Sequence, residues 1–301
     1  MKPLSEMSIA MIKKQNKSNN NNWVVQKQEN GQTLQDYLAA KLNVSKRVAK
    51  QQIDAKVVRI NGQLVWMARH KVHTNDKVAV ATIVKSPTAV SARPKNIKVL
   101  FEDDYYMVVD KPRGILVNEA AISVETILRE QTGIPTLQVS HRLDRDTTGC
   151  LIVSKTEEAH NAIVEVFKRH CVTKTYRTIV HGRWDATSST IDLPVDGQRA
   201  LSNIHCLQAN NDASHLSVRI ETGRTHQIRK HLAMARHPVL GDGTYGFKVV
   251  ENPQLQKITY PLLHAVELEF EHPYLDKVMK VFSPLPQEFH RWLTFLKLSP
   301  R

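Results

Sequence analysis

The sequence predicts an α+β fold, in which a small α+β domain precedes a larger domain with a mixed, largely antiparallel sheet and flanking helices. The length of 301 residues exceeds the usual size of one domain, and 41% apolar content is enough for one sizeable core and a smaller one. Short runs rich in β-branched residues recur between tight turns, as in the strands of a meander. Residues 84–96 have the Ser-Pro and Arg-Pro composition of a linker. These observations predict two domains, at residues 31–83 and 97–301.

Two helices and a few short strands are predicted in the small domain. Leucines recur at every fourth residue from position 34 to 42, after Thr33 as a plausible N-cap and before Asn43, which would close the helix. A second helix is predicted at 44–53, and an Asn-Gly turn indicates a hairpin. The polar, Asn-rich residues 1–22 are predicted to be a disordered tail.

The larger domain is predicted to alternate strands with a few helices. Thr156 is the predicted N-cap of a helix that runs to about residue 170, a second helix is predicted to begin near Thr225, and a third from Pro286. On the second helix, Thr225 and Arg229 would share a face. The predicted strands of this domain are residues 97–101, 105–109, 137–139, 150–153, 173–180, 201–207 and 216–220.

Positive charge is concentrated at the N-terminal end of the chain. The net charge is +13, and residues 1–95 hold 17 Lys and Arg against five Asp and Glu. Such a surface attracts polyanions, because neutralised phosphates release condensed counterions. Nucleic acid is therefore the predicted partner. An anionic membrane is less favoured, since no amphipathic helix with a bulky apolar face accompanies the charge.

The cysteine count and the absence of apolar stretches limit the class of protein. Cys150, Cys171 and Cys206 are an odd number at no metal-ligand spacing, so neither a disulfide framework nor a metal site is predicted. No run approaches 18 apolar residues, and the N-terminus lacks the apolar block of a signal peptide. A cytoplasmic protein with no membrane attachment is expected.

A charged turn at residues 140–149 is the strongest local signal. It lies between two β-branched runs, and five of its ten residues are ionisable, including Arg142, Asp144 and Asp146. A solvated salt-bridge ladder on a surface hairpin would be the simplest explanation for an arbitrary charged turn. The full string His-Arg-Leu-Asp-Arg-Asp-Thr-Thr-Gly, however, resembles the signature loop of the pseudouridine synthases that modify large-subunit ribosomal RNA and some tRNAs. Members of that family usually have Ser at the position of Thr148.

Two further strings resemble the same family. Lys174-x-Tyr176 matches a short motif that is weak alone, because a buried core tyrosine would also fit. Gly-Arg-Thr-His-Gln-Ile-Arg, at residues 223–229, is followed by His-Pro, Gly-Asp and Tyr-Gly pairs at family-like intervals. One departure is Asn118, which stands where the family commonly has His after a Lys-Pro-x-Gly string. The resemblance covers residues 97–285.

The resemblance implies roles for several residues in the conversion of uridine to its carbon-linked isomer. Asp144 would act at the sugar, either by attacking the anomeric carbon or by stabilising positive charge and removing a proton. Arg229 would hold Asp144 in a bidentate salt bridge, and Tyr176 would stack on the detached base. Arg142 would fill the gap left by the extruded nucleotide. The remaining implied contacts with the base, the cleft or phosphate are Leu263, Lys111, Arg224 and His226.

Residues 31–83 resemble the small RNA-binding domain first known from ribosomal protein S-four. Its second helix would present Lys46, Arg47 and Lys50 to RNA. An ordinary solvated helix face is the alternative interpretation of these cations.

The sequence thus predicts a monomeric isomerase that needs no cofactor or metal and acts on structured RNA, with large-subunit ribosomal RNA as the favoured substrate. The same chemistry on tRNA is one alternative. A non-catalytic RNA-binding or ribosome-assembly factor is another.

Overall fold

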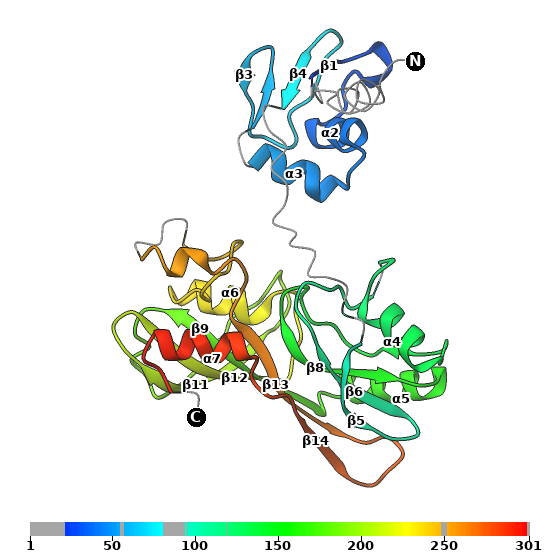
Figure 1. Cartoon of the computed structure of the whole chain (residues 1–301), viewed down its shortest axis with the longest axis vertical. Coiled ribbons are helices and arrows are strands. Elements are labelled where there is room, and N and C mark those ends of the chain that lie inside the picture. The colour runs from blue at the N-terminus through cyan, green and yellow to red at the C-terminus, as the bar shows by residue number, and fades with distance from the viewer. Residues whose placement is uncertain are drawn as a thin grey trace, which may run out of the picture. The chain divides into compact units, whose positions relative to one another are not determined.

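The computed structural model describes residues 22–54, 57–80, 94, 96–118, 120–247 and 252–299. The chain separates into two compact units, Met1–Ala89 and Val90–Arg301 (Figure 1). Residues 1–21 of the predicted tail and most of the predicted linker at 84–96 lie outside the described residues. Within the described ranges, no helix is long and apolar enough to cross a membrane.

The small unit consists of a four-stranded antiparallel sheet with two α-helices. The sheet order is β1-β4-β2-β3. Its elements are β1 (Asn22–Val24), the 3-10 helix η1 (Lys27–Glu29), α2 (Leu34–Leu42), α3 (Lys46–Asp54), β2 (Val58–Ile60), β3 (Gln63–Leu64) and β4 (Lys77–Val80).

Local sequence explains where α2 begins and ends. The Thr33 hydroxyl accepts a hydrogen bond from the Asp36 amide at 3.2 Å, which satisfies one of the free amides of the first turn. Asn43 ends the helix in the left-handed conformation, with φ of 52°. Leu34 and Leu38 are buried in the core of the unit. The predictions of α2 and its caps are confirmed.

Strand β1 corrects the prediction for the start of the small domain. Asn22, Trp23 and Val24 pair with β4, so residues 22–30 belong to the unit and its first element precedes residue 31. The polar Asn run before Trp23 concealed this strand, because a three-residue edge strand carries too short an alternation to detect.

A ten-stranded sheet forms the centre of the large unit. Eight strands follow the order β10-β11-β12-β9-β13-β8-β6-β5, while β14 pairs with β13 and β7 with β8. Every described pairing is antiparallel except that of β13 with β8. The strands are β5 (Lys98–Glu102), β6 (Tyr106–Lys111), β7 (Gln138–Val139), β8 (Thr148–Ser154), β9 (Val172–His181), β10 (Ser188–Asp192), β11 (Leu201–Ala209), β12 (Ala213–Ile220), β13 (Leu263–Glu271) and β14 (Val278–Phe282). The predicted mixed, largely antiparallel sheet is confirmed.

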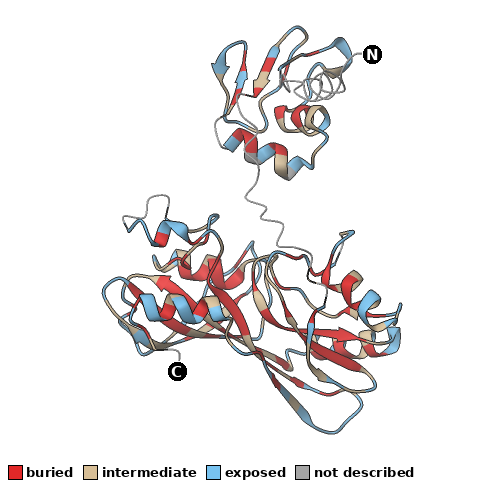
Figure 2. Ribbon diagram, in the orientation of Figure 1, coloured by how far each residue is buried: buried red, intermediate tan, exposed pale blue. Residues whose placement is uncertain are grey.

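Helices cover both faces of this sheet, and its central strands are buried (Figures 1 and 2). Apolar residues of α4 and α6 pack in one core cluster with alternate residues of the strands. Residues of α5 and α7 pack in separate clusters with the intervening strand residues, which point the other way. The helices are α4 (Val124–Thr132), α5 (Glu157–Lys168), α6 (Gln227–Met234), the 3-10 helix η2 (Leu255–Lys257) and α7 (Gln287–Phe295).

The start of α6 differs from the prediction. The helix begins at Gln227 rather than near Thr225, because His226 adopts the left-handed conformation with φ of 56°. Thr225 is outside the helix, so the predicted helical face shared by Thr225 and Arg229 is wrong. Sequence patterns do not reveal a left-handed histidine before a helix. A separate difference is α4, which was not predicted from the sequence.

Gly149 allows β8 to lie against β13. Its φ is 108°, and a Cβ at this position would overlap the backbone of Ala265.

We expect Gly149→Ala to destabilise the protein by roughly 3 kcal/mol or more, because backbone strain adds to overpacking. Gly197 also has positive φ, of 76°, but nothing lies within 4 Å of its hypothetical Cβ. Gly197→Ala should therefore cost only about 1–2 kcal/mol, from the left-handed backbone alone. Denaturant unfolding of both variants checks this, and equal losses would contradict it.

Candidate active site

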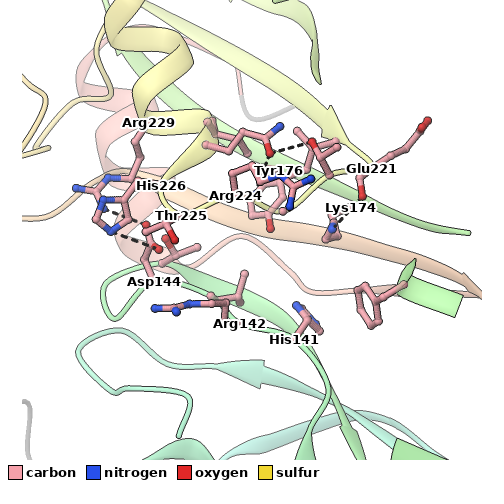
Figure 3. A pocket seen from close by; sticks show the side chains of 18 of the residues that line it. His141, Arg142, Asp144, Lys174, Tyr176, Glu221, Arg224, Thr225, His226 and Arg229 are labelled. Atoms are coloured by element: carbon pink, nitrogen blue, oxygen red, sulfur yellow. Dashed lines mark hydrogen bonds and ion pairs between the residues drawn. The ribbon is translucent and has the colours of Figure 1, made fainter. Parts of the chain in front are cut away.

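A cleft of about 520 Å³ opens between the β7–β8 turn, β9 and the start of α6. This volume is within the usual range for ligand pockets. Figure 3 shows Asp144, Tyr176, Arg224, His226 and Arg229 around it. Segments far apart in the sequence thus bring the predicted residues together.

The central strands explain why the turn and Tyr176 lie side by side. Tyr176 on β9 is opposite Ala265 on β13, and Thr148 at the start of β8 is opposite His264 on the same strand. The Thr148 hydroxyl and the His264 Nδ1 are 2.7 Å apart in a hydrogen bond. The hydroxyl that Thr148 shares with serine is therefore used to join β8 to β13.

Lys111 supports the backbone of the β7–β8 turn and does not line the cleft. Its side chain is fully buried, and Nζ donates hydrogen bonds to the backbone carbonyls of Pro112, Arg145 and Thr147 at 2.9–3.0 Å. Burial lowers the pKa of Lys111 to about 7, against the opposing influence of the Asp146 and then the Asp144 charges. The predicted contact of Lys111 with phosphate or the cleft is wrong, because its amine is occupied by the backbone that carries Asp144.

His141 fixes the other end of the turn. Its Nε2 accepts a hydrogen bond from the Ile152 amide at 3.1 Å. Burial, and then the nearby Lys174 charge, lower the pKa of His141 to about 3. The ring is therefore neutral near pH 7, in the tautomer that leaves Nε2 free to accept.

Arg229 binds two carboxylates at once. Its Nη1 donates to Asp144 Oδ2 at 3.0 Å, while Nε and Nη2 donate to the two oxygens of Asp242 at 2.6 and 2.8 Å. The predicted salt bridge between Arg229 and Asp144 is present. Its predicted bidentate geometry is wrong, since the guanidinium fork holds Asp242 and only one further nitrogen reaches Asp144. Burial opposes the charge of Arg229, but the two carboxylates raise its pKa above its ordinary value.

Asp242 is the residue that sequence reasoning missed. Its side chain has no exposed surface, and its Oδ1 also accepts from the amides of Thr244 and Tyr245 at 2.9 and 3.1 Å. Burial would raise the pKa of Asp242, but the Arg229 hydrogen bonds and charge, with both amides, outweigh burial and lower it. The Gly-Asp pair belonged to the matching strings, but nothing in the sequence identified its partner.

Tyr176 and Leu263 form the apolar part of the cleft. Both are only 6% exposed. Burial, and then the charge of Asp144, raise the pKa of Tyr176 above its ordinary value. The phenol is therefore protonated near pH 7, so it can stack or donate but does not start the reaction as a phenolate.

Comparison with known proteins identifies the family. Residues 105–234 match the family model described as RNA pseudouridylate synthase. The chain is 29% identical to the ribosomal large subunit pseudouridine synthase D of Haemophilus influenzae, covering 91% of this chain and 94% of that protein. It is 31% identical to the protein of the same name in Pseudomonas aeruginosa, covering 77% and 82% of the two chains.

The chain belongs to the RNA pseudouridine synthase family. It is therefore an isomerase, as the motifs predicted. The solved structure of human RNA pseudouridylate synthase domain containing 4 has a similar fold, with a TM-score of 0.59 at 22% identity over 67% of this chain and 94% of that one.

Cationic groups of the pseudouridine synthase surround the mouth of the cleft. Arg142 is exposed on the turn, and Arg224 donates from Nε to the Arg199 carbonyl at 3.2 Å. Lys174 lies deeper, where Nζ donates to the Glu221 carbonyl at 3.4 Å. Burial, and then Arg224, lower the pKa of Lys174 to about 8. Lys174 was noted in the sequence only as part of a short motif, and its amine adds a partly buried cation to the cleft.

His226 lies against Asp144 rather than at the rim. Its Nε2 is 3.7 Å from Asp144 Oδ1, and its Nδ1 shares a hydrogen bond of 2.9 Å with the Tyr245 hydroxyl. Burial lowers the pKa of His226, while Asp144 opposes that change.

The second carboxylate of the turn faces elsewhere. Asp146 pairs with Arg145 at 3.1 Å and lines a separate cavity, whereas Asp144 lines the cleft. The two acids are therefore not arranged as an acid/base pair across one substrate. No group of three or more potential metal ligands occurs among the described residues.

Two of the three predicted cations of the small unit form exposed ion pairs. Lys46 pairs with Asp36 at 2.7 Å and Lys50 with Asp54 at 2.6 Å. The side chain of Arg47 lies outside the described part of the structure. The likeness of this unit to the ribosomal-protein S-four domain remains a prediction.

We expect Asp242→Asn to weaken the synthase without a loss of RNA affinity. The amide can still accept from the Thr244 and Tyr245 amides, but it removes the charge that holds Arg229. Stability should fall by about 2–4 kcal/mol, and the single-turnover rate by about 100-fold if Arg229 shifts. The measurements are denaturant unfolding and pseudouridine formation at saturating RNA.

Asp196→Asn is the matched control for this change. Asp196 pairs at 2.6 Å with Lys230, which follows Arg229 on α6, but the Asp196 side chain is 65% exposed. Its loss should change stability by less than about 1 kcal/mol. If both variants kept full activity, Asp242 would have no part in positioning the site.

Proposed function

We propose that this enzyme converts specific uridines of large-subunit ribosomal RNA to pseudouridine, with Asp144 as the group that acts at the sugar. The observation that carries the proposal is the pairing of Asp144 with Arg229 on the wall of a cleft that also contains Tyr176. The choice of ribosomal RNA is supported by the names of the two bacterial relatives.

The reaction breaks the bond between the ring nitrogen of uracil and the anomeric carbon. The base then rotates, and its fifth ring carbon forms a bond to the same sugar carbon. The ring carbon loses a proton and the freed nitrogen gains one, so no redox step occurs. Asp144 can serve either as nucleophile at the anomeric carbon or as the base that removes a sugar proton while positive charge develops.

Arg229 keeps Asp144 ready for either route. The hydrogen bond of 3.0 Å from the Arg229 guanidinium limits the rotation of the Asp144 carboxylate. Asp242 fixes the guanidinium in turn through two hydrogen bonds. Asp144 is 20% exposed, which leaves it accessible to substrate.

Tyr176 and Leu263 would hold the detached uracil while it rotates. A buried aromatic ring offers a stacking face, and Leu263 offers an apolar wall. Because the phenol is protonated, Tyr176 can stack on the detached base or donate a hydrogen bond to one of its carbonyl oxygens. The cations Arg224 and Lys174 and the ring of His226 line the same cleft and suit phosphate or carbonyl oxygens.

A paired or stacked uridine must be extruded to reach this cleft. Extrusion costs a few kcal/mol, which cationic and stacking contacts offset. Arg142 is exposed on the turn beside Asp144, where it could fill the space that the nucleotide leaves. The small unit would bind RNA outside the target nucleotide. We further propose that the enzyme acts as a cytoplasmic monomer.

Complementation tests the catalytic residue and the substrate together. In cells that lack the gene, the wild-type protein should restore specific pseudouridines in large-subunit ribosomal RNA. Asp144→Asn should restore none while keeping RNA affinity within a few fold, because it removes the charge but not the shape. Asp146→Asn, the control on the same turn, should retain most activity because Asp146 faces another cavity.

Pseudouridine mapping of ribosomal RNA and tRNA from these cells gives the result. Restoration by Asp144→Asn would overturn the catalytic assignment. Restored sites confined to tRNA would overturn the substrate assignment.

A further inference from the structure

The loop that connects β3 to β4 exposes two large apolar side chains next to each other. In this platform loop, residues 65–71, the Trp66 side chain is 59% exposed and that of Met67 is 58% exposed. Tryptophan is highly buried on average in folded proteins. Single exposed apolar residues are common, and we infer an interaction surface here because two of them are adjacent and one is tryptophan.

The platform loop is held in place by the first turn of α2. The Leu34 amide donates to the His70 carbonyl at 2.7 Å, and the Gln35 amide donates to the Ala68 carbonyl at 3.1 Å. These helix amides have no partner inside the helix. Because the loop carbonyls satisfy them, the loop backbone is fixed and Trp66 is presented on a rigid support.

The platform loop also carries two exposed cations. Arg69 and Lys71 are both exposed, and within the described part of the small unit neither forms an ion pair. Lys46 and Lys50 on α3, by contrast, each have a carboxylate partner. Among the described side chains, Arg69 and Lys71 are therefore available to a polyanion, whereas Lys46 and Lys50 would first have to leave their carboxylate partners.

We propose that the platform loop binds an unpaired nucleotide of the RNA substrate, with Trp66 stacked on the base. Arg69 and Lys71 would contact the flanking phosphates, and Met67 would pack against the edge of the base. This inference rests on the proposed role of the small unit in RNA binding. Aromatic side chains stack on any splayed base, and nearby cations follow the backbone.

The surface continues from the platform loop to α3. The Gln35 side chain donates from Nε2 to the Lys46 carbonyl at 2.9 Å, so the start of α2 joins the two regions. Exposed ion pairs such as Lys46–Asp36 contribute little stability and can be exchanged for phosphate contacts. A protein partner could also use Trp66, but the exposed cations of the platform loop and the RNA substrate of the family favour RNA.

Affinity measurements with the full chain test the proposal. The probes are a fluorescein-labelled RNA hairpin with an unpaired loop and the same sequence annealed to its complement. Trp66→Ala should weaken hairpin binding by about tenfold and change duplex binding by less than about twofold, because the duplex offers no free base face. Trp66→Phe should retain hairpin affinity within about threefold.

The salt dependence separates stacking from charge. The double variant Arg69→Gln/Lys71→Gln should reduce the slope of log affinity against log salt for the hairpin by about 1.4, since it removes two phosphate contacts. Trp66→Ala should leave that slope unchanged. Trp66 is exposed, so thermal unfolding of Trp66→Ala should match the wild type.

Wild-type hairpin affinity in Trp66→Ala would overturn the proposal, and so would equal losses for hairpin and duplex. Capture of a protein but not of the hairpin by the wild type would point to a protein partner instead. If the wild-type protein bound the hairpin but made no pseudouridine in large-subunit ribosomal RNA, that result would contradict the proposed function without contradicting this binding surface.

Discussion

The buried guanidinium of Arg229, shared by Asp144 and Asp242, is the interaction on which the site depends. A buried charge is tolerated only when it is paired and hydrogen-bonded. Two carboxylates satisfy this requirement for Arg229, which is 8% exposed. Because Asp242 takes the bidentate fork, Asp144 is held by one nitrogen and keeps an accessible oxygen. The arrangement fixes the carboxylate without enclosing it.

The rest of the large unit brings these three residues together from distant parts of the chain. Lys111 holds the backbone on either side of Asp146 through the carbonyl groups of Arg145 and Thr147, and His141 anchors the turn to β8. Gly149 then allows β8 to approach β13, which lies next to Tyr176 on β9. The turn is therefore held from the sheet side by Lys111 and from the helix side by Arg229. Lys111 thus binds backbone carbonyls and Arg229 binds carboxylates, although both were predicted to line one cleft.

The sequence predicted features that depend on short-range chemistry. Thr33 and Asn43 mark the ends of α2 through hydrogen bonds within one turn, and the motif string around Asp144 identified the family. Features that depend on long-range pairing were not predicted. Asp242 and Lys111 acquire their roles from partners on other elements, and neither spacing nor composition names such partners. The left-handed His226 that delays α6 and the short strand β1 are likewise set by tertiary contacts.

Asp242 contacts Arg229 and not Asp144, so it should act on the reaction only through Arg229, and a double-mutant cycle tests this dependence. Single-turnover rates would be measured at saturating RNA for Asp242→Asn, Arg229→Lys and the double variant, at a temperature where all three are folded. Lysine cannot span both carboxylates, so Arg229→Lys should already remove the effect of Asp242. We predict that the double variant is slower than Arg229→Lys by no more than about twofold. If the fold-losses in rate of the two single variants instead multiplied in the double variant, Asp242 would influence the reaction independently of Arg229, which would contradict its proposed action through Arg229.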